Sequence, residues 1–268
     1  MASTVAIIGN GFDLNLGMPT SYLDFLRSPH FPASQDEKSL SSVLCRMSEI
    51  ERWVDIELEL VQYSAANPGR PTFQSEYNAL RSALGEYINS LPVPMLDGTT
   101  HAHRLIQKLV TSDDPLVVYF NYTSSVRKLL EHAKMDSVTL TQRHWSIHGT
   151  CEDQNTIFGV DDQSPISADH PFLYKSFAPN FSARGLLRQL IEATEVHFFG
   201  HSLGPPDHMY FRGYFQHLAA NHTDATVTFH YYGESGRIDL LSQVRTLCGG
   251  RVAEVRSNAH VVMEDVSA

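Results

Sequence analysis

Cysteine is scarce in this chain, and the three that are present stand far apart. Cys45, Cys151 and Cys248 form no CxxC pair, so the sequence predicts neither a disulfide framework nor a zinc ribbon. No basic segment precedes the first apolar run, and no apolar run is long enough to span a membrane. We therefore expect a cytoplasmic protein that has no signal peptide, no transmembrane helix and no bound metal.

Positive charge is also in short supply. The 268 residues include 20 Lys and Arg against 30 Asp and Glu, which gives a formal net charge of -10 at pH 7. Binding to a nucleic-acid backbone needs a basic surface, so we expect no DNA or RNA partner, although a local basic pocket would still fit within an acidic surface. Hydrophobic residues make up 42% of the chain, enough for one large domain with a sizeable core.

Short aliphatic runs that end at a glycine or a polar residue predict the strands of a parallel sheet. The run at 4–8 stops at Gly9, which is typical of a central strand. Later runs have the same form and most precede residues with helical spacing, which predicts a Rossmann-like α/β fold, mostly parallel, with helices on both faces. Strands are expected at 116–120, 145–147 with 156–160 close behind, 195–199 and 225–232, and helices at 124–133, 182–193, 207–219 and 235–247.

A helical insertion is expected after the first strand and helix, at about residues 36–113 of a single domain that spans 1–268. Residues 39–64 and 72–90 have the spacing of long amphipathic helices, with a break at 67–71 that contains two prolines. In the first of these helices Trp53, Ile56 and Leu60 form one apolar stripe. Asp55 and Glu57 lie off this stripe, and their roles stay open.

The turn Gly9-Asn10-Gly11 is typical of a phosphate-binding turn. A strand that ends in Gly-x-Gly before a helix directs backbone N–H groups to one point, and without Cβ atoms a pyrophosphate can approach closely. An ordinary strand-to-helix turn is the alternative. Asp13 and Asn15 follow and can contact a ribose or a leaving group, although Asp13 can equally cap the next helix.

A standard dinucleotide fold carries an acidic residue about 20 positions after the glycine turn, which holds the ribose hydroxyl. Asp36 and Glu37 are the candidates here, but neither follows a second strand. This disfavours an ordinary dehydrogenase.

Asn121 and His148 follow two of the predicted strands and are expected at the carboxyl edge of the sheet, where α/β proteins bind ligands. The amide of Asn121 can position a water or a carboxamide, and the imidazole of His148 can act as a general base. Beside a phosphate-binding turn, they suggest attack at a glycosidic carbon. The alternatives are an Asn121 that forms a turn with its own backbone and a packed histidine among the 14 of the chain.

A second glycine turn, Gly200-His201-Ser202, follows the strand at 195–199. Gly200 and Ser202 are predicted to hold the second half of a dinucleotide. Asp207 either contacts the nucleotide or caps the helix that begins there.

Five motifs in this order resemble the AbiH abortive-infection family. They are IIGNGFDLNLGMPTSYLDFL at 7–26, WVDIELEL at 53–60, FNYT at 120–123, IHG at 147–149 and GHSLGPPDHMYF at 200–211. The match spans nearly the whole chain. The resemblance implies a bacterial protein of phage defence, in which infection triggers a toxic or growth-arresting activity.

The AbiH family is in turn similar to sirtuin-type NAD-binding proteins. This resemblance implies that 9–11 and 200–203 contact the nucleotide, that Asn121 orients a water and the nicotinamide, and that His148 is the base. Thr123 stands where sirtuins carry an aspartate, and the four-cysteine zinc module is absent. Protein deacylation is therefore not implied, and hydrolysis of NAD is the closer analogy.

We therefore expect an NAD glycohydrolase with Asn121, His148 and Asp13 as catalytic residues and NAD as its substrate or ligand. A non-catalytic module that senses NAD or ADP-ribose is the first alternative, and a nuclease toxin is the second. A homo-oligomer and a partner protein of the defence system stay open. Nucleotide contacts are expected from Gly9, Asn10, Gly11, Asn15, Thr123, Gly200, Ser202 and Asp207.

Overall fold

The computed structural model describes residues 3–50, 55–182 and 184–267. Its centre is a sheet of six parallel strands in the order β3-β2-β1-β4-β5-β6. This confirms the predicted Rossmann-like fold, because the strand order is that of the doubly wound dinucleotide-binding sheet. The strands are β1 (Thr4–Ile8), β2 (Leu116–Tyr119), β3 (His144–Ser146), β4 (Glu195–Phe199), β5 (Thr226–Tyr231) and β6 (His260–Asp265).

β1 lies in the middle of the sheet because it is apolar on both faces. All of its residues are buried, and it pairs with β2 on one side and β4 on the other. Successive side chains of a strand point to opposite faces. Val5 and Ile7 accordingly join one apolar cluster, and Ala6 and Ile8 join a second cluster on the other face.

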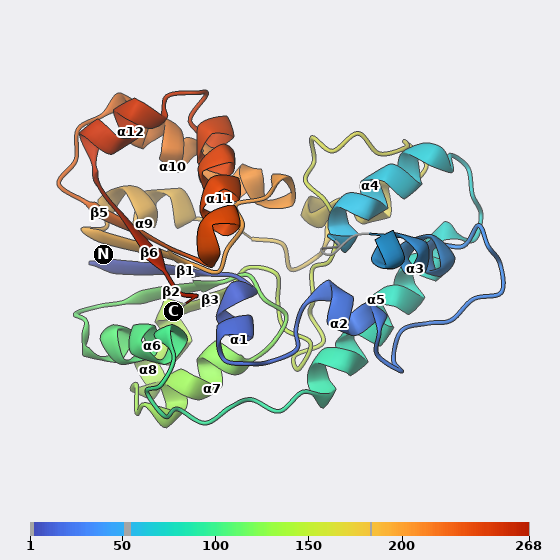
Figure 1. Ribbon diagram of the computed structural model, residues 1–268, viewed down its shortest axis with the longest axis horizontal. Coiled ribbons are helices and arrows are strands. Elements are labelled where there is room, and N and C mark those ends of the chain that lie inside the picture. The colour runs from blue at the N-terminus through green and yellow to red at the C-terminus, as the bar shows by residue number, and fades with distance from the viewer. Residues whose placement is uncertain (1–2, 51–54, 183, 268) are drawn as a thin grey trace.

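Helices cover both faces of the sheet (Figure 1). On one face lie α9 (Leu186–Glu192), α10 (His208–Ala220), α11 (Gly233–Leu247) and α12 (Val252–Asn258). On the other lie α1 (Gly11–Asn15), α6 (His101–Thr111), α7 (Ser125–His132) and α8 (Ser137–Arg143). The sheet and these helices are called the sheet body below.

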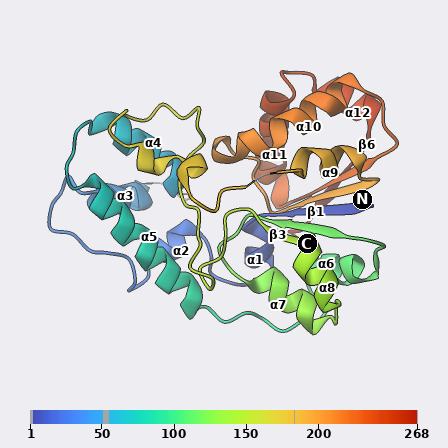
Figure 2. The same ribbon diagram turned by 180° about the vertical axis from the view of Figure 1, so that it is seen from behind.

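A second group of helices lies beyond the carboxyl ends of the strands (Figures 1 and 2). It has an apolar cluster of its own, to which the segment 150–177 contributes Phe158 and Leu173. We call these helices and that segment the helical layer. Its elements are α2 (Tyr22–Leu26), α3 (Leu40–Ile50), α4 (Ile56–Ala66) and α5 (Phe73–Ser90), with the 3-10 helices η1 (Pro171–Leu173) and η2 (Lys175–Phe177).

Several elements differ from the sequence prediction. The helix expected at 39–64 consists of α3 and α4, and Asp55 begins α4 by accepting hydrogen bonds from the N–H groups of Glu57 and Leu58. Trp53 lies outside the described residues. The expected strand at 156–160 is wrong, because this stretch packs within the helical layer and forms a single bridge at Val160. The helix α6 falls within the range of the expected insertion but packs on the sheet.

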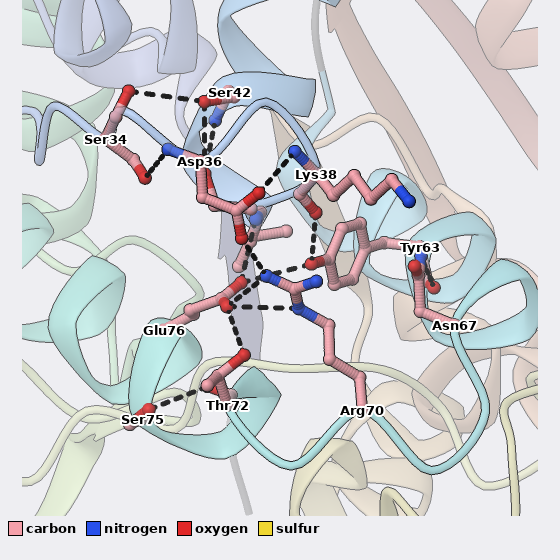
Figure 3. Close-up of polar contacts among 12 residues, drawn as sticks. Ser34, Asp36, Lys38, Ser42, Tyr63, Asn67, Arg70, Thr72, Ser75 and Glu76 are labelled. Carbon is pink, nitrogen blue, oxygen red and sulfur yellow. Dashed lines mark hydrogen bonds and ion pairs between the residues drawn. The ribbon is translucent and has the colours of Figure 1, made fainter.

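Asp36 belongs to an ionic network of the helical layer (Figure 3). Its carboxylate lies 2.6 Å from Nη2 of Arg70, and the same nitrogen lies 2.8 Å from Oε1 of Glu76. Glu76 also accepts hydrogen bonds from the Leu40 N–H and the Tyr63 hydroxyl. Glu76 of α5 thus contacts α3 and α4, and Asp36 is linked to it through Arg70 and does not follow a strand of the sheet.

The turn after β1 packs directly against the turn after β4. The Gly11 N–H donates to the Gly200 carbonyl (2.9 Å), and the Gly9 N–H donates to the Phe199 carbonyl (3.0 Å). A Cβ on Gly11 would lie 2.6 Å from the Gly200 Cα, and one on Gly9 would lie 2.6 Å from the His201 Cα. This contact between two backbones requires the glycines and fixes the spacing of the two turns.

Gly11→Ala is expected to lower the free energy of unfolding by about 1–3 kcal/mol, because the new methyl group has no room against Gly200. Gly85→Ala is the matched control, since a Cβ on this α5 glycine meets nothing within 4 Å and alanine favours a helix by up to about 1 kcal/mol. Urea unfolding measures both changes. Equal stability of the two variants would refute the close contact.

Candidate active site

The turns after β1, β2, β3 and β4 meet at one edge of the sheet, facing the helical layer (Figure 1). The chain runs from β1 to β2 on one side, and β4 returns to the other side of β1. The gap between β1 and β4 is therefore the topological switch point, outside which open α/β sheets bind ligands. Among the predicted site residues, Asp13, Asn121, His148, Gly200 and Asp207 come from these turns or directly follow them.

Asp13 is the centre of a buried polar network. It is fully buried on α1, and its Oδ2 accepts hydrogen bonds from Asn121 Nδ2 (2.8 Å), the Thr123 hydroxyl (2.7 Å) and the Tyr119 hydroxyl (3.4 Å). The Ser125 hydroxyl donates to its other oxygen. Asn10 holds the N-cap position of α1, so Asp13 is not a cap. It instead ties the turn after β2 to the turn after β1.

Burial raises the pKa of Asp13, and the hydrogen bonds from Ser125, Thr123, Asn121 and Tyr119 only partly offset that rise. A carboxyl group whose pKa is raised by burial is a common feature of active sites, because it can give or take a proton closer to neutral pH.

A second buried network surrounds Lys175, whose side chain has no exposed surface. Its Nζ lies 3.0 Å from Oε2 of Glu57 and 2.9 Å from Oδ1 of Asp207. The Tyr122 hydroxyl donates to the other oxygen of Glu57 at 2.9 Å. Glu57 and Lys175 belong to the helical layer, whereas Asp207 ends η3 (Pro205–Asp207) in the sheet body. The network therefore crosses from one part of the molecule to the other.

The charges of this second network are not equivalent. Burial lowers the pKa of Lys175. The carboxylates of Asp207 and Glu57 raise this pKa by more than burial lowers it, so the net shift is upward. Burial raises the pKa of Asp207, but Lys175 and His148 bring it well below its usual value. For Glu57 burial prevails over Lys175, and its pKa is raised. Lys175 and Asp207 are thus the charged pair, and Glu57 is the carboxyl group that protonates more readily.

His148 lies beside Asp207 and is only 3% exposed. Its Nε2 is 3.1 Å from Asp207 Oδ1, which is ion-pair distance, although the N–H direction is not aligned for a hydrogen bond. His201 approaches the other oxygen of Asp207 at 3.4 Å through Nε2, while its Nδ1 accepts from the Leu203 N–H. One carboxylate therefore faces two imidazoles and one ammonium group.

The structure sorts the predicted site residues into groups. Asp13, Asn121 and Thr123 share the first network, and His148 and Asp207 share the second. Asn121 and His148 follow neighbouring strands but belong to different networks. Gly9, Gly11 and Gly200 form the backbone contact between turns.

The remaining predicted nucleotide contacts have local roles. Asn10 Nδ2 donates to the Thr20 carbonyl, and Asn15 Oδ1 accepts from the Ala102 N–H at the start of α6. Ser202 is exposed and accepts from the Gly204 N–H. Their contacts with a nucleotide stay predictions.

Sequence reasoning missed Lys175 and left the role of Glu57 open. A lysine within the mainly apolar stretch Phe-Leu-Tyr-Lys-Ser-Phe at 172–177 is the signal that indicates a buried cation. Tyr119 and Ser125 were not assigned to the Asp13 network either. Their signal is the alternation of polar residues at 119, 121, 123 and 125 on one side of the chain.

A cavity of about 250 Å³ borders the Asp13 network. Thr123 belongs to both, because its hydroxyl bonds to Asp13 and it lines the cavity. The cavity is smaller than a typical ligand pocket of about 300–1,000 Å³. It is lined by Met18, Ile88, Asn89, Leu91, Val93, Thr123, Ser124, Lys128 and Glu152.

In the described part of the chain, no three His, Cys, Asp or Glu side chains are arranged to hold a metal ion. None of the helices there combines the length and the apolar character needed to cross a membrane.

Comparison with known proteins gives one family match. The model for "Bacteriophage abortive infection AbiH" matches residues 5–89 and 70–229, a span that runs from β1 into β5 and includes both buried networks. A comparison with curated proteins returned no match.

Asp13→Asn tests the buried carboxyl group. Because the folded-state pKa of Asp13 is raised above its unfolded value, its contribution to stability is complete below about pH 4 and is lost as pH rises through the folded pKa. The asparagine cannot ionise, so the wild type should lose stability relative to Asp13→Asn as pH rises above about 4. Urea unfolding from pH 4 to 8 measures this difference. The exposed α11 residue provides the control Asp239→Asn, and a wild-type curve parallel to that of Asp13→Asn would contradict the prediction.

Proposed function

The chain belongs to the bacteriophage abortive-infection family AbiH, and on this basis we propose that it is an NAD glycohydrolase, which releases nicotinamide and ADP-ribose. One observation carries the proposal: the turns after four neighbouring strands bring an amide, an imidazole and buried carboxyl groups to the switch point of a Rossmann-like sheet. Nucleotide ligands of such sheets bind at this point.

The reaction breaks the bond between the ribose carbon and the nicotinamide nitrogen, through a state in which positive charge develops on the sugar ring. Water then adds to the ribose carbon and loses a proton. Asn121 donates through Nδ2 to Asp13, which leaves its Oδ1 as the acceptor that orients the water. His148 takes the proton, and the carboxyl group of Asp13 is the second polar group near the ribose.

The phosphate contacts need groups other than the first glycine turn. The N–H groups of Gly9 and Gly11 already donate to Phe199 and Gly200, so a phosphate would bind them only if the two turns separated. The polar side chains at the switch point fit a ribose and its leaving group better than they fit a pyrophosphate.

Purified wild-type protein is expected to release nicotinamide from NAD, as measured by chromatography. Asn121→Ala and His148→Ala should each lower kcat by about 100-fold or more, the usual effect of removing an acid–base or water-orienting group. Asn78 and His222 are exposed and far from these turns in the chain, and Asn78→Ala and His222→Ala are the matched controls. Equal rates in all four variants would remove the assignment.

A nucleotide-sensing module is the second candidate, and the burial of the site favours it. Asn121 is 5% exposed and His148 is 3% exposed, so neither presents its side chain to solvent in the closed protein. A ligand that opens the two turns can change the conformation of the helical layer without being hydrolysed.

This second function predicts binding without turnover. ADP-ribose at 100 times its Kd should stabilise the fold by about 2.7 kcal/mol and raise the Tm, while NAD is left intact. Differential scanning calorimetry with chromatography of the nucleotide separates the two functions. A Tm that neither NAD nor ADP-ribose changes would count against both.

A further inference from the structure

The strand β6 forms one edge of the sheet and has a partner strand on its inner side. It comes last in the strand order, pairs with β5, and lies in front of the other strands in Figure 1. The parallel pairing with β5 is unbroken from His260 to Asp265, so β6 contains no bulge. A free strand edge readily pairs with another chain, and proteins usually protect such edges with lysine, proline, a bulge or a very short strand.

The opposite edge of the sheet has this kind of protection, whereas β6 does not. β3 is only three residues long. β6 has six residues, none of which is lysine or proline, and Val261, Val262 and Met263 within it are half-buried. The chain that follows does not turn across the outer edge, because the N–H of Val266 donates to the Tyr231 carbonyl of β5. The length and apolar character of β6 therefore call for a partner at this edge.

The hydrogen bonds with β5 determine which backbone groups of β6 face outward. The N–H groups of His260 and Val266 donate to carbonyls on the β5 side, those of Ala225 and Tyr231. Because the N–H and C=O groups of a strand point to alternate sides from one residue to the next, the even-numbered residues of β6 face β5. The backbone groups of the odd-numbered residues 261, 263 and 265 face outward and are those that a further strand would bind.

A second copy of the chain fits this edge about a two-fold axis, which makes the two β6 strands antiparallel. The outward-facing groups of the two strands must lie opposite one another, and this condition leaves few registers. In one of them Val262 lies opposite Val262 of the second copy, and Val261 lies opposite Met263. His260 then lies opposite Glu264, on both sides of the axis. The imidazole can donate to the carboxylate whether the ring is neutral or protonated.

The neighbouring registers match less well. A shift in one direction places Glu264 opposite Val262 and Asp265 opposite Val261, so that carboxylates face aliphatic side chains without a polar partner. A further shift in that direction places Glu264 opposite its own copy, and like charges directly opposite one another are destabilising. A shift in the other direction pairs fewer residues of the two strands. The sequence of β6 therefore selects the register in which His260 faces Glu264.

We propose that β6 is a homodimer interface, in which two copies pair antiparallel with Val262 on the two-fold axis and the two six-stranded sheets become one continuous sheet. The complementary pair of His260 and Glu264, repeated on both sides of the axis, is what favours a second copy over a different partner. Because one pair of strands makes a small interface, the dimer is reversible. The interface lies outside the candidate active site, so the inference does not depend on the proposed function.

Sedimentation velocity of the wild type between about 1 and 500 µM should show a concentration-dependent equilibrium of monomer and dimer. Val262→Lys places two ammonium groups opposite one another at the axis and should raise the dimer Kd at least about tenfold. Val138→Lys is the matched control, since Val138 is a valine of α8 that is 61% exposed. A wild type that stays monomeric throughout would leave the edge to another protein and overturn the inference, as would a dimer that Val262→Lys does not weaken.

The charge pair is tested by reversal and rescue. His260→Glu places two carboxylates opposite one another on each side of the axis and should raise the dimer Kd at least about fivefold. Adding Glu264→Lys to this variant restores opposite charges and should return the Kd to within about threefold of the wild-type value. His132→Glu, on the exposed surface of α7, is the control for the first substitution. A double variant that dimerises no better than His260→Glu would contradict the register.

Cysteine cross-linking tests the register directly. Val262 lies in a non-hydrogen-bonded pair, in which opposite Cα atoms are about 4.5 Å apart and within disulfide range. Val262→Cys should form a disulfide between chains under mild oxidation, seen on a non-reducing gel, in a Cys45→Ser background that removes the exposed native cysteine. Met263→Cys is the control, because Met263 of the second copy lies on the diagonal, about 7–8 Å away. Absence of the Val262→Cys disulfide, or a stronger cross-link from Met263→Cys, would overturn the inference.

Discussion

The ammonium group of Lys175 has no contact with solvent, and an unpaired charge in that position would cost several kcal/mol. Glu57 and Asp207 must therefore stay within ion-pair distance whenever the protein is closed. This requirement fixes α4, the segment 150–177 and η3 relative to one another, although they are far apart in the chain. The helical layer is thus held at the carboxyl edge of the sheet by this buried ionic network together with apolar packing, since Tyr122 of the turn after β2 packs against the apolar cluster of the layer.

The same edge holds Asp13, whose hydrogen-bond donors all come from one short segment of the sequence. Tyr119 ends β2, and Asn121, Thr123 and Ser125 follow at every second position, with Ser125 as the first residue of α7. All four side chains reach the Asp13 carboxyl group. A buried carboxyl group with four donors satisfies its hydrogen-bonding needs within the protein, which explains how it tolerates complete burial.

Features set by local pattern were predictable from the sequence, and features set by distant partners were not. β1 and β4 were predicted to the residue, because each is a short run of mainly apolar residues that stops at a glycine, Gly9 or Gly200. β6 was missed, since at the sheet edge His260 and Glu264 are exposed and break the apolar pattern. Asn121 and His148 were placed correctly after their strands. Their partners were not foreseen, because the pairing of Lys175 with Glu57 joins residues 118 positions apart.

A closed site also suits the role of the family. Hydrolysis of NAD, the activity proposed above, would harm a cell that carries no phage, so a site that is closed to solvent in the resting protein agrees with that proposal. In this protein Asn121 and His148 are both buried at the edge that the helical layer covers.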